Sequence, residues 1–409
     1  MNNFDIAVIG GGASGLAAAI TAKRNNPSSR IVILERLSRI GKKILATGNG
    51  RCNYTNRNID ITDYHGSCRN LYNSIKDFSC EEFFETLGVY GYSDDEFRVY
   101  PLNNNASAIL DGLRLEILKL GIDVICDFNV TDIKKEKKYR IISENDFITA
   151  TSVIIAGGGM SQANLGSDGS MIRIMKKMGL SVSPLYPALT SIKVNPESIR
   201  SLKGIRTNAV VSLFSDNKKL DTQRGEVQFG DGTISGICVF NLSCLAGGKD
   251  KLELSIDMLP DINYNEAKKL IHDIRKIRAS SPLEDFLSGI LNKRIGMNII
   301  KSCTSHALTE KAECLTEKEL NSITASIKDY RFKITGLSGF EKSQVTAGGL
   351  SIVEMDSSLR SKKFRNMYFC GEILDIIGYC GGYNLYFAFG SGALAGKTCA
   401  EDLLNDKGK

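Results

Sequence analysis

The sequence has few of the residues that build disulfide frameworks or metal centres. Its 11 cysteines form an odd, scattered set without a CxxC pair, so a disulfide framework is not expected. Histidine occurs only three times, as His65, His272 and His306. Because paired ligand spacing is also missing, we expect no structural zinc or iron–sulfur site and no bound metal. Most of the thiols are expected to be small core hydrophobes.

Long apolar segments and low-complexity tracts are missing as well. The chain has no run of 18 apolar residues, and it enters a strand-like pattern at once, without the basic and apolar regions of a secretory signal. We therefore expect no membrane association and a cytoplasmic location. The 42% hydrophobic and 24% charged residues are typical of a globular protein, and 409 residues predict two or three domains.

The most informative segment that is present is IAVIGGGASGLAAA at 6–19, which predicts a strand, a glycine turn and a helix. Gly10 permits the tight turn, Gly12 lets the backbone approach a pyrophosphate, and Gly15 allows close helix packing. Glu35 follows the apolar run 31–34, where a carboxylate accepts hydrogen bonds from a ribose. This context favours dinucleotide binding over a purely structural turn. The expected contacts come from Gly10, Gly12, Ala13, Ser14, Gly15, Glu35 and Arg36.

A second candidate segment is the polar, glycine-punctuated loop RIGKKILATGNGRCNYTN at 39–56. A loop this long and this rich in donors is typical of a binding site, and its donors suit an electron-rich ring system. The alternative is an ordinary surface loop. The cofactor contacts predicted here are Lys42, Lys43, Thr47, Gly48, Asn49 and Gly50.

The rest of the chain predicts a nucleotide-binding domain with an insertion. Residues 73–121 look helical, with Gly121 as a C-cap, and the segments 122–128, 139–142 and 147–155 suggest a small antiparallel addition before a buried strand ending at Ala156 and Gly157. We place the first part of the binding domain at 1–186, a β-rich insertion at 187–262, a helical part at 263–339 and the second part of the binding domain at 340–409.

The C-terminal region carries a second glycine-opened helix. Strand-like residues 366–374 precede GGYNLYFAFGSGALAG at 381–396. A helix that begins there directs free N–H groups and a positive dipole end at its neighbour, which would stabilise a reduced flavin that is anionic near N1 and O2. The alternative is a plain packed helix. The predicted contacts are Gly371, Glu372, Gly382, Tyr383, Asn384 and Leu385.

Four segments together resemble the BaiN/RdsA-type flavoproteins, which are also labelled YhiN-like or aminoacetone oxidase family proteins. The segments are IGGGASGLAAA, GKKILATGNGRCNYTN, VTAGGLS at 345–351 and FCGEILDIIGYCGGYNLYFAFGSG. The resemblance spans the chain and implies bound FAD. The implied fold class is α/β, with a Rossmann-like FAD-binding domain of the two-dinucleotide-binding-domain flavoprotein type and an inserted β-barrel-like plus helical domain.

Two segments depart from the family pattern. The usual ATGG strand end reads Ala156-Gly157-Gly158-Gly159, and the segment resembling FTHxGLSGP reads FGDGTISGI at 229–237. The second departure lies in the insertion, so it bears on the substrate and leaves the FAD expectation unchanged.

The resemblance implies FAD-dependent reduction of an activated C=C bond, because members are associated with dihydrouridine formation in large-subunit rRNA or with reduction of unsaturated bile-acid intermediates. Such a reaction needs a hydride donor, an acid and donors for the enolate oxygen. We hypothesise Cys52 as the acid, with Tyr383 and Cys380 as competing donors, and Arg51 and Asn53 on the oxygen. Alternatively, Cys52 is a small residue that fits beneath the ring.

The electron donor and the substrate stay open at this stage. Only one complete GxGxxG with its acid occurs, so NADH or NADPH is expected to bind transiently, or a carrier protein supplies electrons. Basic residues gather at 134–138 and along 268–301, a distribution that permits a nucleic-acid partner. The basic insertion favours an RNA substrate, and a solvated helix face with an exposed hairpin is the alternative. A small-molecule ene-reductase, an amine or aminoketone oxidase and a non-catalytic flavoprotein are the competing functions.

Overall fold

The computed structural model describes residues 3–407, which form two compact units. Unit 1 comprises the chain up to Pro187 together with the segment from Phe340 onward, and unit 2 is Ala188–Gly339. Each unit has its own hydrophobic core. The chain therefore leaves unit 1, builds unit 2 and returns to complete unit 1.

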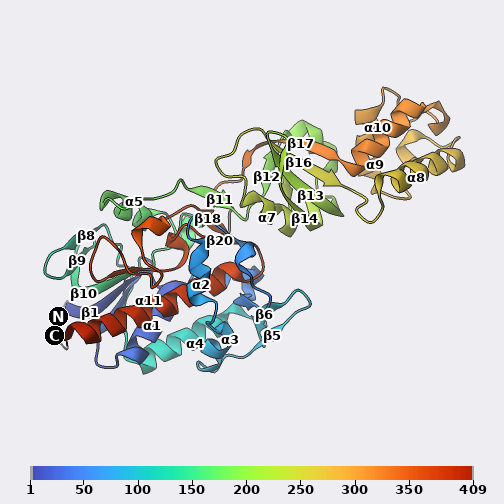
Figure 1. Ribbon diagram of the computed structural model, residues 1–409. Helices are drawn as coiled ribbons and strands as arrows, with labels where there is room; N and C mark the ends of the chain where they lie inside the picture. The colour runs from blue at the N-terminus through green and yellow to red at the C-terminus, as the bar shows by residue number, and fades with distance from the viewer. Residues whose placement is uncertain (1–2, 408–409) are drawn as a thin grey trace. The chain divides into compact units, whose positions relative to one another are not determined.

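Unit 1 is built on a seven-stranded sheet (Figure 1). Its strands are β1 (Asn3–Ile9), β2 (Ile31–Leu34), β7 (Asp123–Ile125), β8 (Asp132–Lys135), β9 (Tyr139–Ile142), β10 (Phe147–Ile155) and β19 (Met367–Phe369). Their order is β7-β2-β1-β10-β9-β8, and β19 also pairs with β10. Strand β1 is parallel to both β2 and β10, and β2 is entirely buried. Apolar strands of this kind are typical of a parallel sheet covered on both faces.

Two long helices pack side by side against this sheet (Figure 1). They are α1 (Ala13–Asn25) and α11 (Tyr383–Lys407), from opposite ends of the chain. A Cβ atom on Gly392 would lie 2.2 Å from the carbonyl oxygen of Ser14, and one on Gly396 would lie 2.2 Å from that of Ala18. Small residues therefore allow the two helix backbones to approach closely, which joins the two sequence-distant parts of unit 1.

The prediction of helix through 73–121 is only partly correct. The structure has α2 (Tyr72–Ile75), α3 (Cys80–Glu85) and α4 (Ala106–Lys119), but β5 (Gly91–Ser93) and β6 (Arg98–Pro101) lie between them. Tyrosine and valine favour strands, and Pro101 disfavours a continuous helix. Gly121 does follow α4 in the left-handed region, with φ of +64°, and its N–H bonds to Leu118, as expected for a C-cap.

The expected antiparallel addition is also partly correct. Strands β8, β9 and β10 form it, but β7 instead pairs parallel with β2 at the other sheet edge. Three short pairings complete unit 1 and its boundary: β3 (Thr55–Asn56) with β6, β4 (Tyr64–His65) with β20 (Ile377–Gly378), and β11 (Tyr186–Ala188) with β18 (Val345–Ala347). Helix α5 (Ser170–Lys177) follows β10 in the chain.

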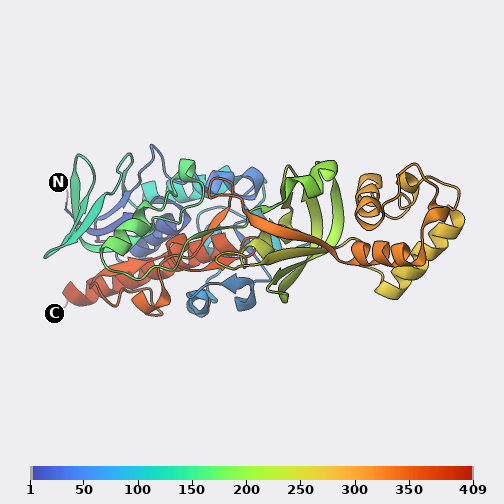
Figure 2. The ribbon, with the colours of Figure 1, turned by 90° about the horizontal axis from the view of Figure 1, so that it is seen from above.

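Unit 2 combines a closed barrel with a helical part. The barrel strands, in spatial order, are β12 (Ile192–Val194), β15 (Thr233–Ser235), β14 (Lys218–Phe229), β13 (Arg206–Ser215), β16 (Leu252–Asp257) and β17 (Tyr330–Leu337). Short helices α6 (Pro196–Ile199) and α7 (Ile237–Ser243) accompany it. Helices α8 (Tyr264–Ile277), α9 (Lys293–Cys303) and α10 (Glu317–Lys328) lie between β16 and β17 in the chain and at one end of the barrel in both views (Figures 1 and 2).

Candidate active site

The glycine turn after β1 provides an open helix N-terminus. A Cβ atom on Gly10 would lie 2.3 Å from the Ala156 carbonyl oxygen, and one on Gly15 would lie 1.9 Å from the Gly10 carbonyl oxygen. A Cβ atom on Gly12 would meet nothing within 4 Å, and Gly12 caps α1 without a side-chain hydrogen bond. The turn therefore uses two glycines for packing and presents the third, with the first amides of α1, to a ligand. This arrangement fits a pyrophosphate.

Glu35 lies next to this turn at the end of β2. The Gly11 amide donates to its Oε2 at 2.8 Å, and the Leu37 amide donates to its Oε1 at 2.8 Å. These two bonds fix a carboxylate that is only 8% exposed. Because each carboxylate oxygen can accept a further hydrogen bond, the group still fits the ribose hydroxyls of a dinucleotide.

Arg36 pairs with Asp168, at 2.5 Å between Nη1 and Oδ1. Burial opposes ionisation of Asp168, but the hydrogen bonds from Arg36 and Ser170 outweigh it and lower the pKa to about 2. Asp168 also lines a pocket of about 340 Å³ together with Val130 and Arg173. The predicted cofactor residue Arg36 therefore belongs to a fixed ion pair beside a concave surface.

Three strand ends converge on the start of α1. Gly10, Ala156 and Gly371 follow or lie next to the ends of β1, β10 and β19, which are parallel. Gly371 has φ of +76°, and its Cβ atom would lie 2.3 Å from the Ser14 Oγ. At Gly157, a Cβ atom would lie 2.6 Å from the Met171 side chain. The carboxyl ends of parallel strands are where open α/β sheets bind ligands.

The loop 39–56 folds into a compact, strained turn. Residues Ile44–Gly50 form a 3₁₀ segment in which Gly48 and Asn49 adopt left-handed conformations, each with φ of 55°. The Thr47 carbonyl accepts the Cys52 amide at 3.1 Å. A Cβ atom on Gly48 would lie 2.9 Å from the Asn53 Oδ1. Lys42 is partly buried, and Asn49 is exposed. The turn brings Thr47 close to Cys52 and Gly48 close to Asn53.

Cys52 has no exposed surface, because protein atoms alone enclose it. Burial raises the pKa of its thiol to about 12, although a hydrogen bond with Thr47 opposes the shift. An enclosed thiol does not reach a substrate, so the structure favours the alternative interpretation of Cys52 as a small packed residue. Cys380 and Tyr383, by contrast, are partly exposed. Burial raises the pKa of each to about 12, with Arg98 opposing the shift at Cys380, so both keep their protons at neutral pH.

A polar network joins the loop to the C-terminal part of unit 1. Lys43 Nζ lies 2.8 Å from Glu372 Oε2 and donates to the Ser161 carbonyl at 3.3 Å. The Thr346 amide donates to Glu372 Oε1 at 2.9 Å, and the Thr346 hydroxyl accepts the Ser161 amide at 3.0 Å. Thr346 and Ser161 received no role in the sequence interpretation. The VTAGGLS segment, which carries Thr346, was the signal that pointed to it.

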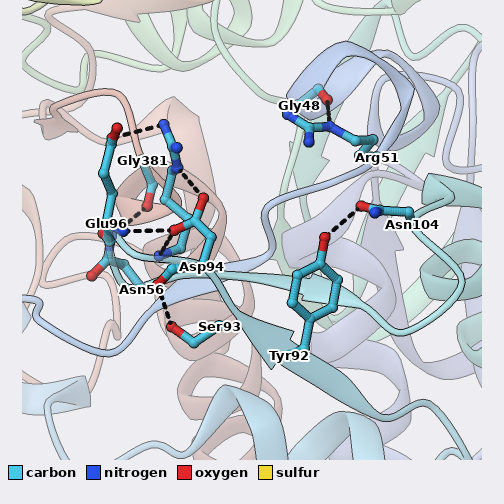
Figure 3. Close-up of polar contacts among 10 residues, drawn as sticks. Gly48, Arg51, Asn56, Tyr92, Ser93, Asp94, Glu96, Asn104 and Gly381 are labelled. Carbon is cyan, nitrogen blue, oxygen red and sulfur yellow. Dashed lines mark hydrogen bonds and ion pairs between the residues drawn. The ribbon is translucent and has the colours of Figure 1, made fainter.

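The glycine pair before α11 is held by backbone contacts. Gly381 and Gly382 have φ of +130° and +103°, and a Cβ atom on Gly382 would lie 2.4 Å from the Thr55 carbonyl oxygen. Asn56 Nδ2 donates to the carbonyls of Gly381 and Glu96 at 3.0 and 3.2 Å (Figure 3). The helix start therefore requires both glycines, and Asn56 ties it to the segment before β6.

The Asn384 side chain holds the turn before α11. Its Oδ1 accepts the Gly378 amide at 2.8 Å, and its Nδ2 donates to the Gly378 carbonyl at 2.8 Å. The neighbouring Tyr383 carbonyl accepts the Tyr64 hydroxyl at 2.8 Å, while Leu385 is partly buried. Asn384 therefore shapes the turn, and the Tyr383 side chain stays partly exposed beside it.

Unit 2 contains one group relevant to the expectation of no metal. His306, Glu310 and Cys314 each place one ligand atom within 4.8 Å of the others. His306 Nδ1 lies 3.0 Å from Glu310, and its Nε2 lies 3.5 Å from Glu319. Both ring nitrogens of His306 thus face carboxylates, and we assign the group no metal-binding role.

The glycine turn after β1, the Glu35 carboxylate beside it and the glycine-opened helix α11 fit a bound FAD, and the chain is an FAD-dependent oxidoreductase. The chain belongs to the HI0933-like family, since the model of the HI0933-like protein Rossmann domain matches residues 4–398. The chain is 34% identical to a 3-dehydro-bile acid delta(4,6)-reductase of Clostridium scindens, with 97% of this chain and 99% of the relative covered. It is 25% identical to a ribosomal RNA dihydrouridine synthase of Escherichia coli, with both chains covered fully.

A solved quinol–fumarate reductase shares the fold. Its TM-score is 0.51 at 14% identity, and the match covers 99% of this chain and 72% of that one. The Rossmann-like FAD-binding fold and the family resemblance are thus confirmed. In the described part of the chain, no helix has the length and apolar character needed to cross a membrane.

Proposed function

We propose that the protein reduces a C=C bond conjugated to a carbonyl group, and that this bond is C5=C6 of a uridine in large-subunit rRNA. Relatives along the full chain are named for reductions, one of them of a bile acid and others of uridine in rRNA. The two substrates share a reacting group. In each, an electron-poor alkene carbon accepts the hydride and a carbonyl oxygen gains negative charge.

The proposal rests on the surroundings of Arg51. Its guanidinium carbon lies 4.7 Å from the centre of the Tyr100 ring, and no carboxylate of the described residues pairs with it in an ion pair. It is exposed and follows directly after the Gly48-Asn49-Gly50 turn. A cation that is held by an aromatic ring and left without a carboxylate is suited to bind a developing enolate oxygen.

The reaction needs a hydride, a group that binds the carbonyl oxygen and a proton donor. When bound, FAD supplies the hydride equivalent to the alkene. Arg51, with Asn53 beside it, binds the carbonyl oxygen. Tyr383 or Cys380 donates a proton to the neighbouring carbon, because each is partly exposed and stays protonated below its pKa of about 12. The positive end of α11 favours negative charge on the ligand next to Gly382.

Several cations of unit 2 support an RNA substrate. Lys268, Lys269, Arg294 and Lys301 lie on α8 and α9 outside the ion pairs found in the described structure. Others of the basic run are neutralised, as with Lys293, which lies 2.9 Å from Asp285. The remaining charges suit the phosphate backbone, and their contribution would fall with added salt.

A small-molecule ene-reductase is the second candidate. The 34% identity to the bile-acid reductase over nearly the whole chain favours it. NADH or NADPH is the proposed electron donor for either substrate. Anaerobic stopped-flow mixing tests the donor, because bleaching of the flavin by one nucleotide supports it and no bleaching by either excludes both. Peroxide formation with an amine would support an oxidase instead.

The substrate is tested by reconstitution. FAD-loaded protein, a reductant and rRNA lacking the modification are mixed, and dihydrouridine is measured by mass spectrometry. We expect dihydrouridine to form with the wild type and to fall at least tenfold with Arg51→Ala at equal FAD content. Reduction of a conjugated enone without any dihydrouridine would contradict the RNA proposal and support the small-molecule reductase.

A further inference from the structure

The two-stranded ribbon of β5 and β6 has two different faces. Tyr92 lies opposite Tyr100 in the register, and the Leu102 amide donates to the Tyr90 carbonyl at 2.9 Å. Because side chains alternate along a strand, Tyr90, Tyr92, Tyr100 and Leu102 belong to one face. We call this set of four residues the tyrosine face.

The opposite face of the ribbon packs on the core of unit 1. Val99 is fully buried, and a Cβ atom on Gly91 would lie 2.2 Å from the hydroxyl of the buried Tyr54. Core packing therefore fixes the ribbon from behind. The tyrosine face points away from that core, and its outer members Tyr90 and Leu102 are 56% and 65% exposed.

The tyrosine face is ordered by its own contacts. The Tyr92 and Tyr100 rings are stacked, with centroids 5.9 Å apart and an interplanar angle of 29°. Tyr100 is only 3% exposed, and Arg51 also lies against its ring at 4.7 Å. The Tyr92 hydroxyl donates to the Asn104 Oδ1 at 2.9 Å (Figure 3). Aromatic rings, a guanidinium and an amide are thus held together at the edge of the loop that carries Arg51.

The ribbon is also tied to the cofactor side of unit 1. Strand β3 pairs with β6 through Thr55 and Asn56, and Asn56 donates to the Gly381 carbonyl. At the ribbon turn, the acids Asp94 and Glu96 both pair with Arg98 at 2.8 Å. Arg98 offsets one of these two negative charges, and the cation beside the tyrosine face is Arg51.

We propose that the tyrosine face binds the RNA substrate by stacking bases on the rings of Tyr90 and Tyr92, while the buried Tyr100 ring supports Tyr92 from the inner side. This rests on the proposed function, and it names the surface that holds the nucleotides around the reacting uridine. Aromatic side chains interleaved with arginine are the usual platform for unpaired bases, because every base has a ring face to stack. Asn104 and Arg51 add donors for base edges and phosphates.

The test measures binding of a labelled, single-stranded, uridine-rich RNA to the FAD-loaded full chain by fluorescence anisotropy. We expect Tyr92→Ala to raise the Kd at least fivefold, and Tyr90→Ala, at a more exposed position, to raise it at least threefold. Tyr92→Phe, which keeps the ring, should bind within twofold of the wild type. Phe147→Ala is the matched control, because Phe147 is a 38% exposed ring stacked on Arg140 at another edge of unit 1.

Photocrosslinking gives a second, positional readout. RNA containing 5-bromouridine should crosslink to the peptide that spans residues 87–104. Equal affinity of Tyr92→Ala, Tyr90→Ala and Phe147→Ala, with crosslinks elsewhere, would overturn the tyrosine-face proposal. If the wild type still formed dihydrouridine in that case, the proposed function would stand. If the wild type neither bound the RNA nor formed dihydrouridine, both proposals would fall.

Discussion

The Lys43 ammonium lies 2.8 Å from the Glu372 carboxylate, although 329 residues separate them in the chain. Lys43 belongs to the loop after β2, and Glu372 lies between β19 and α11. The Thr346 amide completes the contact by donating to the other oxygen of Glu372. This ion pair therefore joins the two parts of the chain that together make the FAD-binding unit.

Replacing Lys43 tests the importance of that junction. Lys43→Met leaves a mostly buried Glu372 carboxylate without its cation, so we expect a loss of about 1 to 3 kcal/mol in the free energy of unfolding. The double variant with Glu372→Gln should lose less than the sum of the single losses. Urea unfolding of the three variants measures this coupling, and additive losses would show that the pair contributes nothing.

Two glycine substitutions separate ligand binding from folding. Gly12→Ala adds a methyl group in open space at an allowed conformation, so we expect the stability of the FAD-free protein to change by at most about 0.5 kcal/mol. FAD affinity should fall at least tenfold, because the methyl group blocks the approach of the pyrophosphate. Fluorescence titration measures the affinity, and unchanged affinity would place the phosphates elsewhere.

Gly15→Ala is the contrasting variant. Its Cβ atom would lie 1.9 Å from the Gly10 carbonyl oxygen, so backbone must move. We expect a loss of stability of about 3 kcal/mol or more, even without FAD. Thermal unfolding of the FAD-free protein measures it, and a stability equal to that of Gly12→Ala would contradict the close packing of α1 on the turn.

Cys52→Ala distinguishes the two interpretations of this residue. Because the thiol is enclosed by protein and its pKa is about 12, we expect substrate turnover to stay within threefold of the wild type. The native thiol should also resist alkylation at pH 8. A hundredfold loss of turnover at full FAD content would restore Cys52 as the proton donor.

Asp168 should contribute stability that depends on pH. Its pKa falls from 3.8 to about 2 in the folded protein, so the contribution is complete above pH 4 and is lost as the pH falls towards 2. We expect about 1 to 2 kcal/mol, after allowance for partial exposure. Unfolding of Asp168→Asn should show a weaker dependence in this window. Asp111→Asn, in an exposed ion pair with Arg114, is the control and should behave like the wild type.

The cofactor cradle was predictable because it depends on contacts that are local in sequence. The glycines of the first turn and the acid after β2 have fixed spacing, and in the structure the Gly11 amide donates to Glu35. The region 86–105 was not predictable, since its strands are stabilised by pairing with β3 and by packing on Tyr54. The segments on either side have helical periodicity, and for this reason helix was wrongly predicted through 86–105.

The roles of individual polar residues could not be predicted from the sequence either. Asn384 was predicted to contact the cofactor, and its hydrogen bonds to the Gly378 backbone could not be foreseen, because tertiary folding makes them. Cys52 lies in a donor-rich turn, yet a positive φ of 57° at this residue accompanies a buried side chain. Which way a side chain points from a strained loop is decided by the whole fold, and so the sequence could not choose between Cys52, Cys380 and Tyr383.

The most direct test of the proposed reaction is mass-spectrometric nucleoside analysis of large-subunit rRNA from cells with and without this gene. Deletion should remove one dihydrouridine. The wild-type gene should restore it, whereas Arg51→Ala should not. Unchanged dihydrouridine in the deletion strain would contradict RNA reduction by this protein and would direct attention to small conjugated enones.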